Sequence, residues 1–164
     1  MKKNLSIIFR LLIVVAILAS CATSKEARTY KKTINGNWQL KTVVSEGIMG
    51  KIKAQIFNEA DFNCFVGSSW HFNSNNSLGS YSISKNGEEC VALKREVRWS
   101  IYETAGEPKL FQFKRLDSKL KEMDEASGGF RFTIIQLDNS TMQLKSDIMF
   151  EGKPASFTYN FVRI

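Results

Sequence analysis

The sequence has little of the chemistry that catalysis and metal binding need. It contains one histidine, His71, and three cysteines in 164 residues. A nucleophilic triad needs a base, and a zinc site needs a set of clustered ligands, so neither is expected here. Strand alternation places His71 on the outside, next to an inward Trp70. Glu88 and Glu89 follow a turn and are interpreted as solvated rather than as paired catalytic carboxylates. No phosphate loop or dinucleotide fingerprint occurs, so we expect a protein that is not an enzyme and has no cofactor.

The apolar run from Leu11 to Cys21 is too short to cross a membrane. A spanning helix needs about 20 apolar residues, and Arg10 interrupts this run at its start. The charged start Met1-Lys2-Lys3, the short apolar middle and the small residues at the exit are the three parts of a secretory signal peptide.

The exit of this run, Leu18-Ala19-Ser20-Cys21, resembles the lipobox of bacterial lipoproteins. The resemblance implies that residues 1–20 are removed, that the Cys21 thiol takes a diacylglycerol, and that the new amino terminus is acylated, for example by palmitate. Ala22, where Asp would retain the protein in the inner membrane, favours the outer membrane of the cell envelope. An ordinary signal peptide with a chance cysteine and a buried strand that carries one are the alternatives.

The mature domain has almost no excess of either charge. The whole chain has a net charge of +7, from 23 basic and 16 acidic residues. Seven of the basic residues and one of the acidic residues precede Ile34, which leaves 16 and 15 in the domain. A nucleic-acid module needs a basic face, so nucleic acid is not an expected partner. Residues 21–33 carry Lys25, Arg28, Lys31 and Lys32, and we interpret them as a solvated tether near anionic headgroups.

Two cysteines remain for the folded domain once Cys21 carries lipid. An exported protein meets an oxidising compartment, so Cys64 and Cys90 are expected to form a disulfide. In the chain-entropy model a loop of this size contributes about 3–4 kcal/mol.

Apolar and polar residues alternate with period two along nearly the whole chain after the tether. Trp70 and Phe72, for example, alternate with His71 and Asn73. Turn residues separate about eight such runs, which is typical of an antiparallel meander or barrel. Residues 50–65 have helical spacing instead and predict one or two helical turns across a barrel end. Residues 117–129 are charged, end in two glycines, and predict a flexible loop with at most a turn of helix.

Two stretches carry a resemblance to a known family. Gly36-Asn37-Trp38 opens the first strand and resembles the Gly-x-Trp signature of lipocalins, while residues 57–81 are similar to the bacterial lipocalin-like domain of envelope lipoproteins. The resemblance implies an all-β, eight-stranded antiparallel up-and-down barrel over residues 34–164, with a short helical segment after the first strand. It also implies that Arg163 packs over Trp38 and that these two residues, with Gly36, close one end of the barrel. The middle lipocalin motif is not recognisable, so the loops and pocket of other lipocalins are not transferred.

The expected barrel interior is strongly aromatic. An eight-stranded barrel is just wide enough to be filled by side chains or to hold one small ligand, and bulky rings favour a filled barrel or a narrow pocket. The candidate pocket consists of Trp70, Phe72, Trp99, Phe111, Phe132 and Tyr159; Trp38, Phe113, Phe157 and Phe161 are also expected to point inward.

Two functions follow from these expectations. The first is a non-enzymatic, lipid-anchored envelope lipoprotein that binds a small apolar ligand in the barrel. The alternative is an accessory or inhibitory module of an envelope protein complex, with a filled barrel. It would act through residues 117–129 and the helical segment, because loops commonly carry such contacts.

Overall fold

Eight antiparallel strands close into a single barrel in the computed structural model, which describes residues 23–48, 55–84, 90–104, 106–124 and 128–164. The strand order is β1-β10-β9-β8-β7-β6-β5-β4, and β4 returns to β1. The predicted eight-stranded up-and-down barrel is therefore confirmed. The barrel strands are β1 (Gly36–Glu46), β4 (Ser69–Asn73), β5 (Leu78–Ile83), β6 (Leu93–Tyr102), β7 (Leu110–Leu116), β8 (Phe130–Leu137), β9 (Thr141–Phe150) and β10 (Lys153–Arg163).

Period-two burial builds the barrel core. In β4, Trp70 and Phe72 are buried while His71 is exposed, as the alternation predicted. A bulge between Leu40 and Thr42 shifts the alternation of β1, which bends the strand as it crosses the barrel. The ten side chains that the sequence placed inside the barrel are all buried: Trp38, Trp70, Phe72, Trp99, Phe111, Phe113, Phe132, Phe157, Tyr159 and Phe161.

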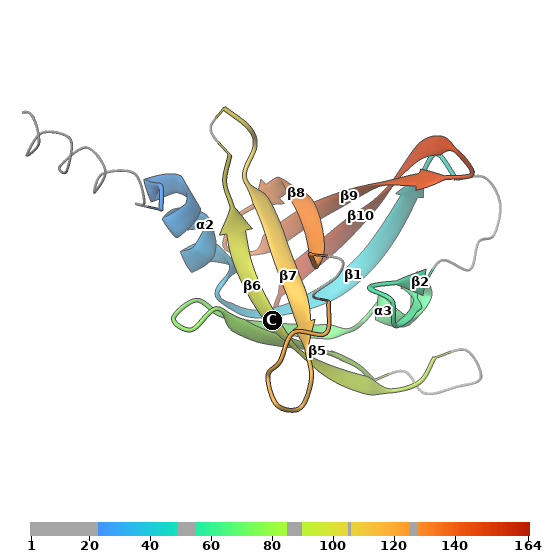
Figure 1. The fold of residues 1–164 in the computed structure, drawn as a ribbon, viewed down its shortest axis with the longest axis horizontal. Helices are drawn as coiled ribbons and strands as arrows, with labels where there is room; N and C mark the ends of the chain where they lie inside the picture. The colour runs from blue at the N-terminus through green and yellow to red at the C-terminus, as the bar shows by residue number, and fades with distance from the viewer. Residues whose placement is uncertain (1–22, 49–54, 85–89, 105, 125–127) are drawn as a thin grey trace, which may run out of the picture.

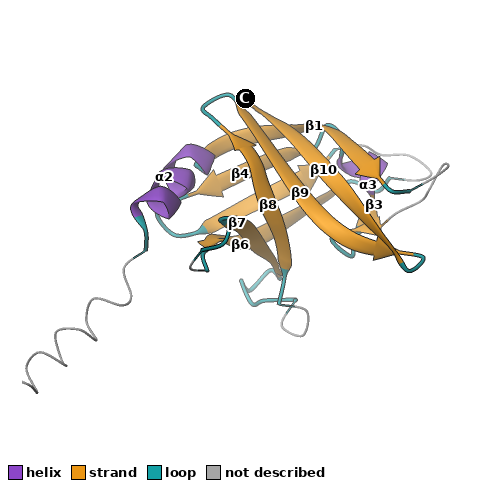
Figure 2. Ribbon diagram, turned by 90° about the horizontal axis from the view of Figure 1, so that it is seen from above, coloured by secondary structure: helices purple, strands orange, loops and turns teal. Residues whose placement is uncertain are grey.

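The remaining elements lie at opposite ends of the barrel (Figures 1 and 2). Helix α2 (Lys25–Ile34) covers one end, which we call the closed end. The mouth segment, residues 55–65, lies at the other end, which we call the mouth. It contains β2 (Gln55–Ile56), β3 (Ala60–Asp61) and the single-turn helix α3 (Phe62–Phe65).

Helix α2 corrects the expectation of a solvated tether for the described part of residues 21–33, from Lys25 onward. The Ser24 side chain caps the helix by accepting a hydrogen bond from the Ala27 amide. Ala27 and Ile34 are buried against the barrel, while basic side chains remain exposed on the outer face of the helix. The segment folds because two apolar residues seven positions apart lie on one helix face and have a barrel end to cover.

The mouth segment and the loop after β7 also differ from the expectation. Within the described residues 55–65, the prediction of one or two helical turns is confirmed by the single turn of α3, but a hairpin of β2 and β3, which was not predicted, precedes it. The predicted flexible loop, residues 117–129, begins with a backbone bridge from Leu116 to Glu122 and has a buried Asp124. This part of the loop is fixed because Asp124 pairs with Arg115 on β7.

Several sequence predictions lie outside the described residues. They include the signal peptide, the lipidation site Cys21, Ala22, residues 50–54 of the helical segment, and Glu88 and Glu89. Within the described part of the chain, no helix is both long and apolar enough to cross a membrane.

Candidate ligand site at the mouth of the barrel

Arg163 and Trp38 lie together at the closed end. The Arg163 guanidinium carbon is 4.3 Å from the centroid of the Trp38 ring. The same guanidinium donates hydrogen bonds to three main-chain carbonyls, those of Thr33, Asn35 and Asn139. Since these carbonyls belong to the end of α2, to the link into β1 and to the β8–β9 turn, one side chain ties three segments across this end.

Gly36 allows this closure because a larger residue does not fit. Its φ is +122°, and a Cβ placed there would lie 2.5 Å from Nη1 of Arg163. The glycine of the Gly-x-Trp signature is therefore required both for its backbone conformation and for the approach of the guanidinium. With this end closed, a ligand would have to enter at the mouth.

The barrel interior is almost completely filled. A cavity among the described aromatic side chains has a volume of about 10 Å³, which is close to the least that holds one water molecule. Five of the six candidate pocket residues line it: Trp70, Phe72, Phe111, Phe132 and Tyr159. The sixth, Trp99, is buried nearer the closed end, where its indole NH donates to the Leu78 carbonyl and Lys31 lies 5.8 Å from its ring.

Phe57 fills the mouth, and the sequence did not identify it as a site residue. It comes from the turn between β2 and β3, outside the barrel sheet, and is only 5% exposed. Its ring centroid lies 5.0 to 6.4 Å from seven other rings, those of Phe65, Trp70, Tyr81, Phe113, Phe130, Phe132 and Tyr159. The mouth segment therefore places an aromatic ring where a ligand of this barrel would lie.

The turn that carries Phe57 has an unusual backbone. Phe57 and Asn58 have φ values of +56° and +52°, and the Glu59 amide donates to the Ile56 carbonyl at 3.2 Å. Asparagine adopts this left-handed conformation readily, but phenylalanine rarely does. Phe57 is held in the conformation by the aromatic cage around its ring.

Two residues further on, the Glu59 carboxylate is also buried, with a side chain that is 5% exposed. The Tyr81 hydroxyl donates to one of its oxygens at 2.5 Å, and Arg95 Nε donates to the other at 2.5 Å. Arg115 Nη1 lies 3.4 Å from that second oxygen. The three donors come from β5, β6 and β7, so the carboxylate connects the mouth segment to three neighbouring barrel strands.

Asp124 completes the charged cluster. Arg115 Nη2 donates to Asp124 at 2.6 Å, and the Arg115 amide donates to the same carboxylate at 2.8 Å. Burial alone would raise the pKa of Asp124, but the hydrogen bonds and the charge of Arg115 outweigh burial and hold it below its usual value. Burial and the neighbouring Glu59 carboxylate raise the pKa of Tyr81, which stays a neutral donor. Two carboxylates thus face two guanidinium groups.

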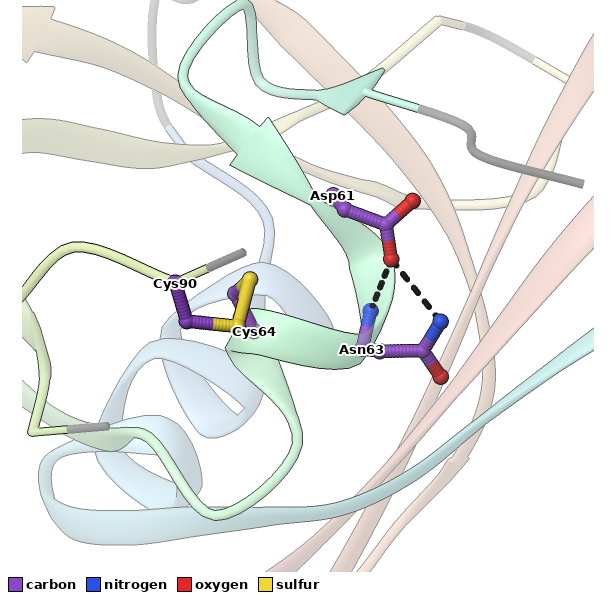
Figure 3. The surroundings of a disulfide bond; sticks show 4 residues. All are labelled: Asp61, Asn63, Cys64 and Cys90. Atoms are coloured by element: carbon purple, nitrogen blue, oxygen red, sulfur yellow. Dashed lines mark hydrogen bonds between the residues drawn. A yellow bond between two sulfur atoms is a disulfide. The ribbon is translucent and has the colours of Figure 1, made fainter. Parts of the chain in front are cut away.

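A disulfide joins the mouth segment to the residues just before β6. Cys64 in α3 is bonded to Cys90, and their Cα atoms are 5.4 Å apart, so the expected pairing is present. Figure 3 shows the bond beside the start of α3, where one Asp61 oxygen accepts hydrogen bonds from the amide and the side chain of Asn63.

Clustered metal ligands are absent from the described ranges. No three His, Cys, Asp or Glu side chains in them are close enough together to hold a metal ion. His71 is exposed, and its Nδ1 atom lies 2.7 Å from the side-chain oxygen of Asn37.

Comparison with known proteins identifies one family and several solved structures that are similar to this chain. The model of the lipocalin-like domain family matches residues 34–144. Among solved structures, a lipocalin-like protein from Bacteroides uniformis ATCC 8492 has 13% identity and a TM-score of 0.43, with 80% of this chain and 99% of that chain covered. Bovine odorant binding protein in complex with a selenium-containing odorant has 14% identity and a TM-score of 0.43, with 87% and 78% covered. A search of curated protein sequences found no significant match. On the strength of the family match, this chain belongs to the lipocalin-like domain family.

Proposed function

We propose that the protein is a non-enzymatic, lipid-anchored binding protein of the cell envelope, and that its barrel takes up one small apolar ligand at the mouth. The observation that carries this proposal is Phe57, a ring from outside the barrel sheet that occupies an aromatic cage. Barrels of this size either hold one small ligand or are filled by side chains. Here the side chain that fills the mouth, Phe57, belongs to the mouth segment and not to a barrel strand.

The mouth segment can move without disruption of the barrel. Among the described strands, β2 and β3 pair with each other in a separate two-stranded sheet. Withdrawal of Phe57 therefore breaks no strand pairing of the barrel, and segments of this kind open at lower free energy than the sheets they cover. A ligand that enters would replace the ring contacts that Phe57 gives up.

Toluene binding to a Phe57→Ala variant tests the proposal. Removal of a buried phenylalanine ring typically costs about 3–5 kcal/mol and leaves an apolar cavity, and such cavities bind benzene-sized molecules. We expect toluene to raise the melting temperature of Phe57→Ala clearly more than that of the wild-type protein.

Phe62→Ala is the matched control, because Phe62 is on the same segment but packs on Phe157, 6.0 Å between ring centroids, and does not line the interior cavity. It should respond to toluene as the wild type does. A folded Phe57→Ala variant that does not bind toluene would refute the proposal.

The lipid anchor and the envelope location rest on the lipobox-like exit at Cys21 and on helix α2. The helix begins at Lys25, four residues after Cys21, and exposes Lys25, Arg28 and Lys32. Basic side chains close to a lipidated residue favour association with anionic lipid.

An outer groove favours the alternative function as an accessory module. It has a volume of about 490 Å³ and lies between the β4–β5 turn and the β7–β8 loop, over the outer faces of β6 and β7. A photo-crosslinking residue in place of Ser100, inside the groove, should give a discrete protein adduct in intact cells if this function holds. The same photo-crosslinking residue in place of the exposed Thr42 on β1 is the control and should give no such adduct. Failure of the residue at position 100 to crosslink would exclude this groove as a contact surface.

A further inference from the structure

The mouth segment places two chemically different groups in the barrel. Phe57 supplies an aromatic ring and Glu59 supplies a carboxylate, and each is at most 5% exposed. Because the two residues lie on the same tight turn, the ring and the carboxylate enter the mouth together.

The barrel wall has a separate receiving site for each group. The ring lies against Trp70, Phe113 and Tyr159, at centroid distances of 5.9, 5.2 and 5.7 Å. The carboxylate is held by the Tyr81 hydroxyl and by the Arg95 and Arg115 guanidinium groups. The two sites are adjacent, since the Tyr81 ring also lies 6.4 Å from the Phe57 ring.

We propose that Phe57 and Glu59 act as a tethered surrogate ligand, and that the protein binds a small aryl carboxylate, which displaces both groups together. This inference rests on the proposed function and adds the chemical class of the ligand. The ligand has one aromatic ring, a short flexible chain and a terminal carboxylate.

The charges of the cluster explain why the ligand should carry a carboxylate. When Glu59 withdraws, Arg115 keeps its ion pair with Asp124. Arg95 loses the ion pair that it makes with Glu59 in the described part of the chain. A neutral apolar ligand would leave the half-buried Arg95 guanidinium and the Tyr81 hydroxyl without the acceptor that Glu59 had provided, which is unfavourable in a site partly shielded from water. A carboxylate ligand replaces one anion with another and restores the same hydrogen bonds.

Calorimetric titration with 4-phenylbutanoate and with its neutral analogue 4-phenylbutanamide tests the inference. In a Phe57→Ala/Glu59→Ala variant, where both sites are vacant, the acid should bind about tenfold more tightly than the amide, because hydrogen bonds to charged groups are the stronger ones. In Phe57→Ala alone, the acid has to compete with the Glu59 carboxylate for Arg95 and Arg115, so its preference over the amide should be smaller.

Glu122 offers a matched control for the charge change. It pairs with Lys114 at 2.6 Å, away from the Glu59 site, so Phe57→Ala/Glu122→Ala removes one carboxylate without vacating the arginine site. This variant should behave like Phe57→Ala. Addition of Arg95→Met to the Phe57→Ala/Glu59→Ala variant should abolish the preference for the acid.

Equal affinity for acid and amide in Phe57→Ala/Glu59→Ala would overturn the inference. If that variant does not fold, Phe57→Ala/Glu59→Gln keeps the side-chain shape and removes the charge, so the acid then competes only with a neutral side chain and should again bind more tightly than the amide. Toluene binding distinguishes a failure of the carboxylate assignment from a failure of the proposed function. Toluene binding without a preference for the acid refutes only the carboxylate, whereas no toluene binding to folded Phe57→Ala refutes the proposed function itself.

Discussion

At the scale of single residues, Phe57 combines a backbone penalty with a packing gain. A left-handed conformation costs a non-glycine residue about 1–2 kcal/mol. Burial of a phenylalanine side chain contributes about 1.5–3 kcal/mol, and favourable ring pairs add about 0.5–1.5 kcal/mol each. Packing therefore outweighs the strain at φ +56°, but the net gain is smaller than for an unstrained core ring. This smaller gain makes Phe57 easier to displace than the rings carried by barrel strands.

Arg163→Ala should lower the free energy of unfolding by about 2 kcal/mol, because stacking on Trp38 and hydrogen bonds to three carbonyls are lost together. Urea unfolding followed by tryptophan fluorescence would measure the change. Arg98→Ala is the control, since Arg98 is exposed on β6. An Arg163→Ala variant as stable as Arg98→Ala would show that the closed end does not depend on this side chain.

The Arg115–Asp124 pair makes stability depend on pH in the acid range. The pKa of Asp124 is lower in the folded protein than in the unfolded chain, so its contribution is complete above the unfolded pKa of about 3.9. That contribution is lost as the pH falls through the folded pKa. The stability difference between the wild type and Asp124→Asn should therefore shrink when urea unfolding is measured at progressively lower pH. Asp147→Asn, which makes the same change at an exposed side chain, is the control, and a difference that stays constant would contradict the assignment.

At the scale of elements, the mouth segment is held by side chains rather than by strand pairing with the barrel. The Phe57 ring, the Glu59 carboxylate and the Cys64–Cys90 disulfide each attach it to a different part of the barrel. Under the proposed displacement, a ligand of similar chemistry replaces the first two attachments. The disulfide is not replaced, so it keeps the segment near the mouth when the other two release.

Removal of the disulfide by Cys64→Ser/Cys90→Ser should lower stability by about 2–4 kcal/mol without loss of the barrel. The barrel survives because its strand ladders lie largely outside the loop that the bond closes. Hydrogen exchange should become faster in residues 55–65 and change little in β9 and β10. Unchanged exchange in the mouth segment would mean that Phe57 and Glu59 alone hold it in place.

The barrel strands could be predicted from the sequence because their alternation reflects local burial. Trp70, Phe72 and Trp99 were placed inside from this pattern alone, and the family resemblance added the order of the strands and the closure. Helix α2 was not predicted, because its apolar face consists of few residues among many charges. The spacing of Ile56 and Phe57 suggested a helix, yet a hairpin forms there.

The contacts that define the candidate site join residues distant in the sequence. Glu59 meets Arg95 and Arg115, which follow it by 36 and 56 residues. The left-handed turn at Phe57 depends on the cage that receives its ring and not on any local preference of phenylalanine. Neither the contacts of Glu59 nor the turn at Phe57 can be predicted from a single sequence, because both depend on how the closed barrel brings distant residues together.

At the scale of the whole molecule, the two barrel ends have different surroundings under the proposed lipid anchor. Four residues of fully extended chain reach about 14 Å, so an anchor at Cys21 would hold helix α2 and the closed end close to the membrane surface. The mouth lies at the opposite end, as Figures 1 and 2 show, and would face away from the lipid. A ligand would then arrive from the aqueous side of the envelope rather than from the bilayer.

Membrane fractionation and residue-specific quenching test this arrangement. Cys21→Ser should leave the protein unprocessed or release it into the soluble fraction, because a single apolar or basic contact does not give stable anchoring. In the lipidated protein, a fluorophore on Asn139→Cys, in the closed-end turn that meets Arg163, should be quenched by a headgroup quencher. The same fluorophore on Glu151→Cys, in the turn between β9 and β10 at the mouth, should not be quenched, because that turn lies about a barrel length from the membrane. A normally processed, membrane-bound Cys21→Ser protein would contradict the anchor, whereas equal quenching at both positions would contradict only the orientation.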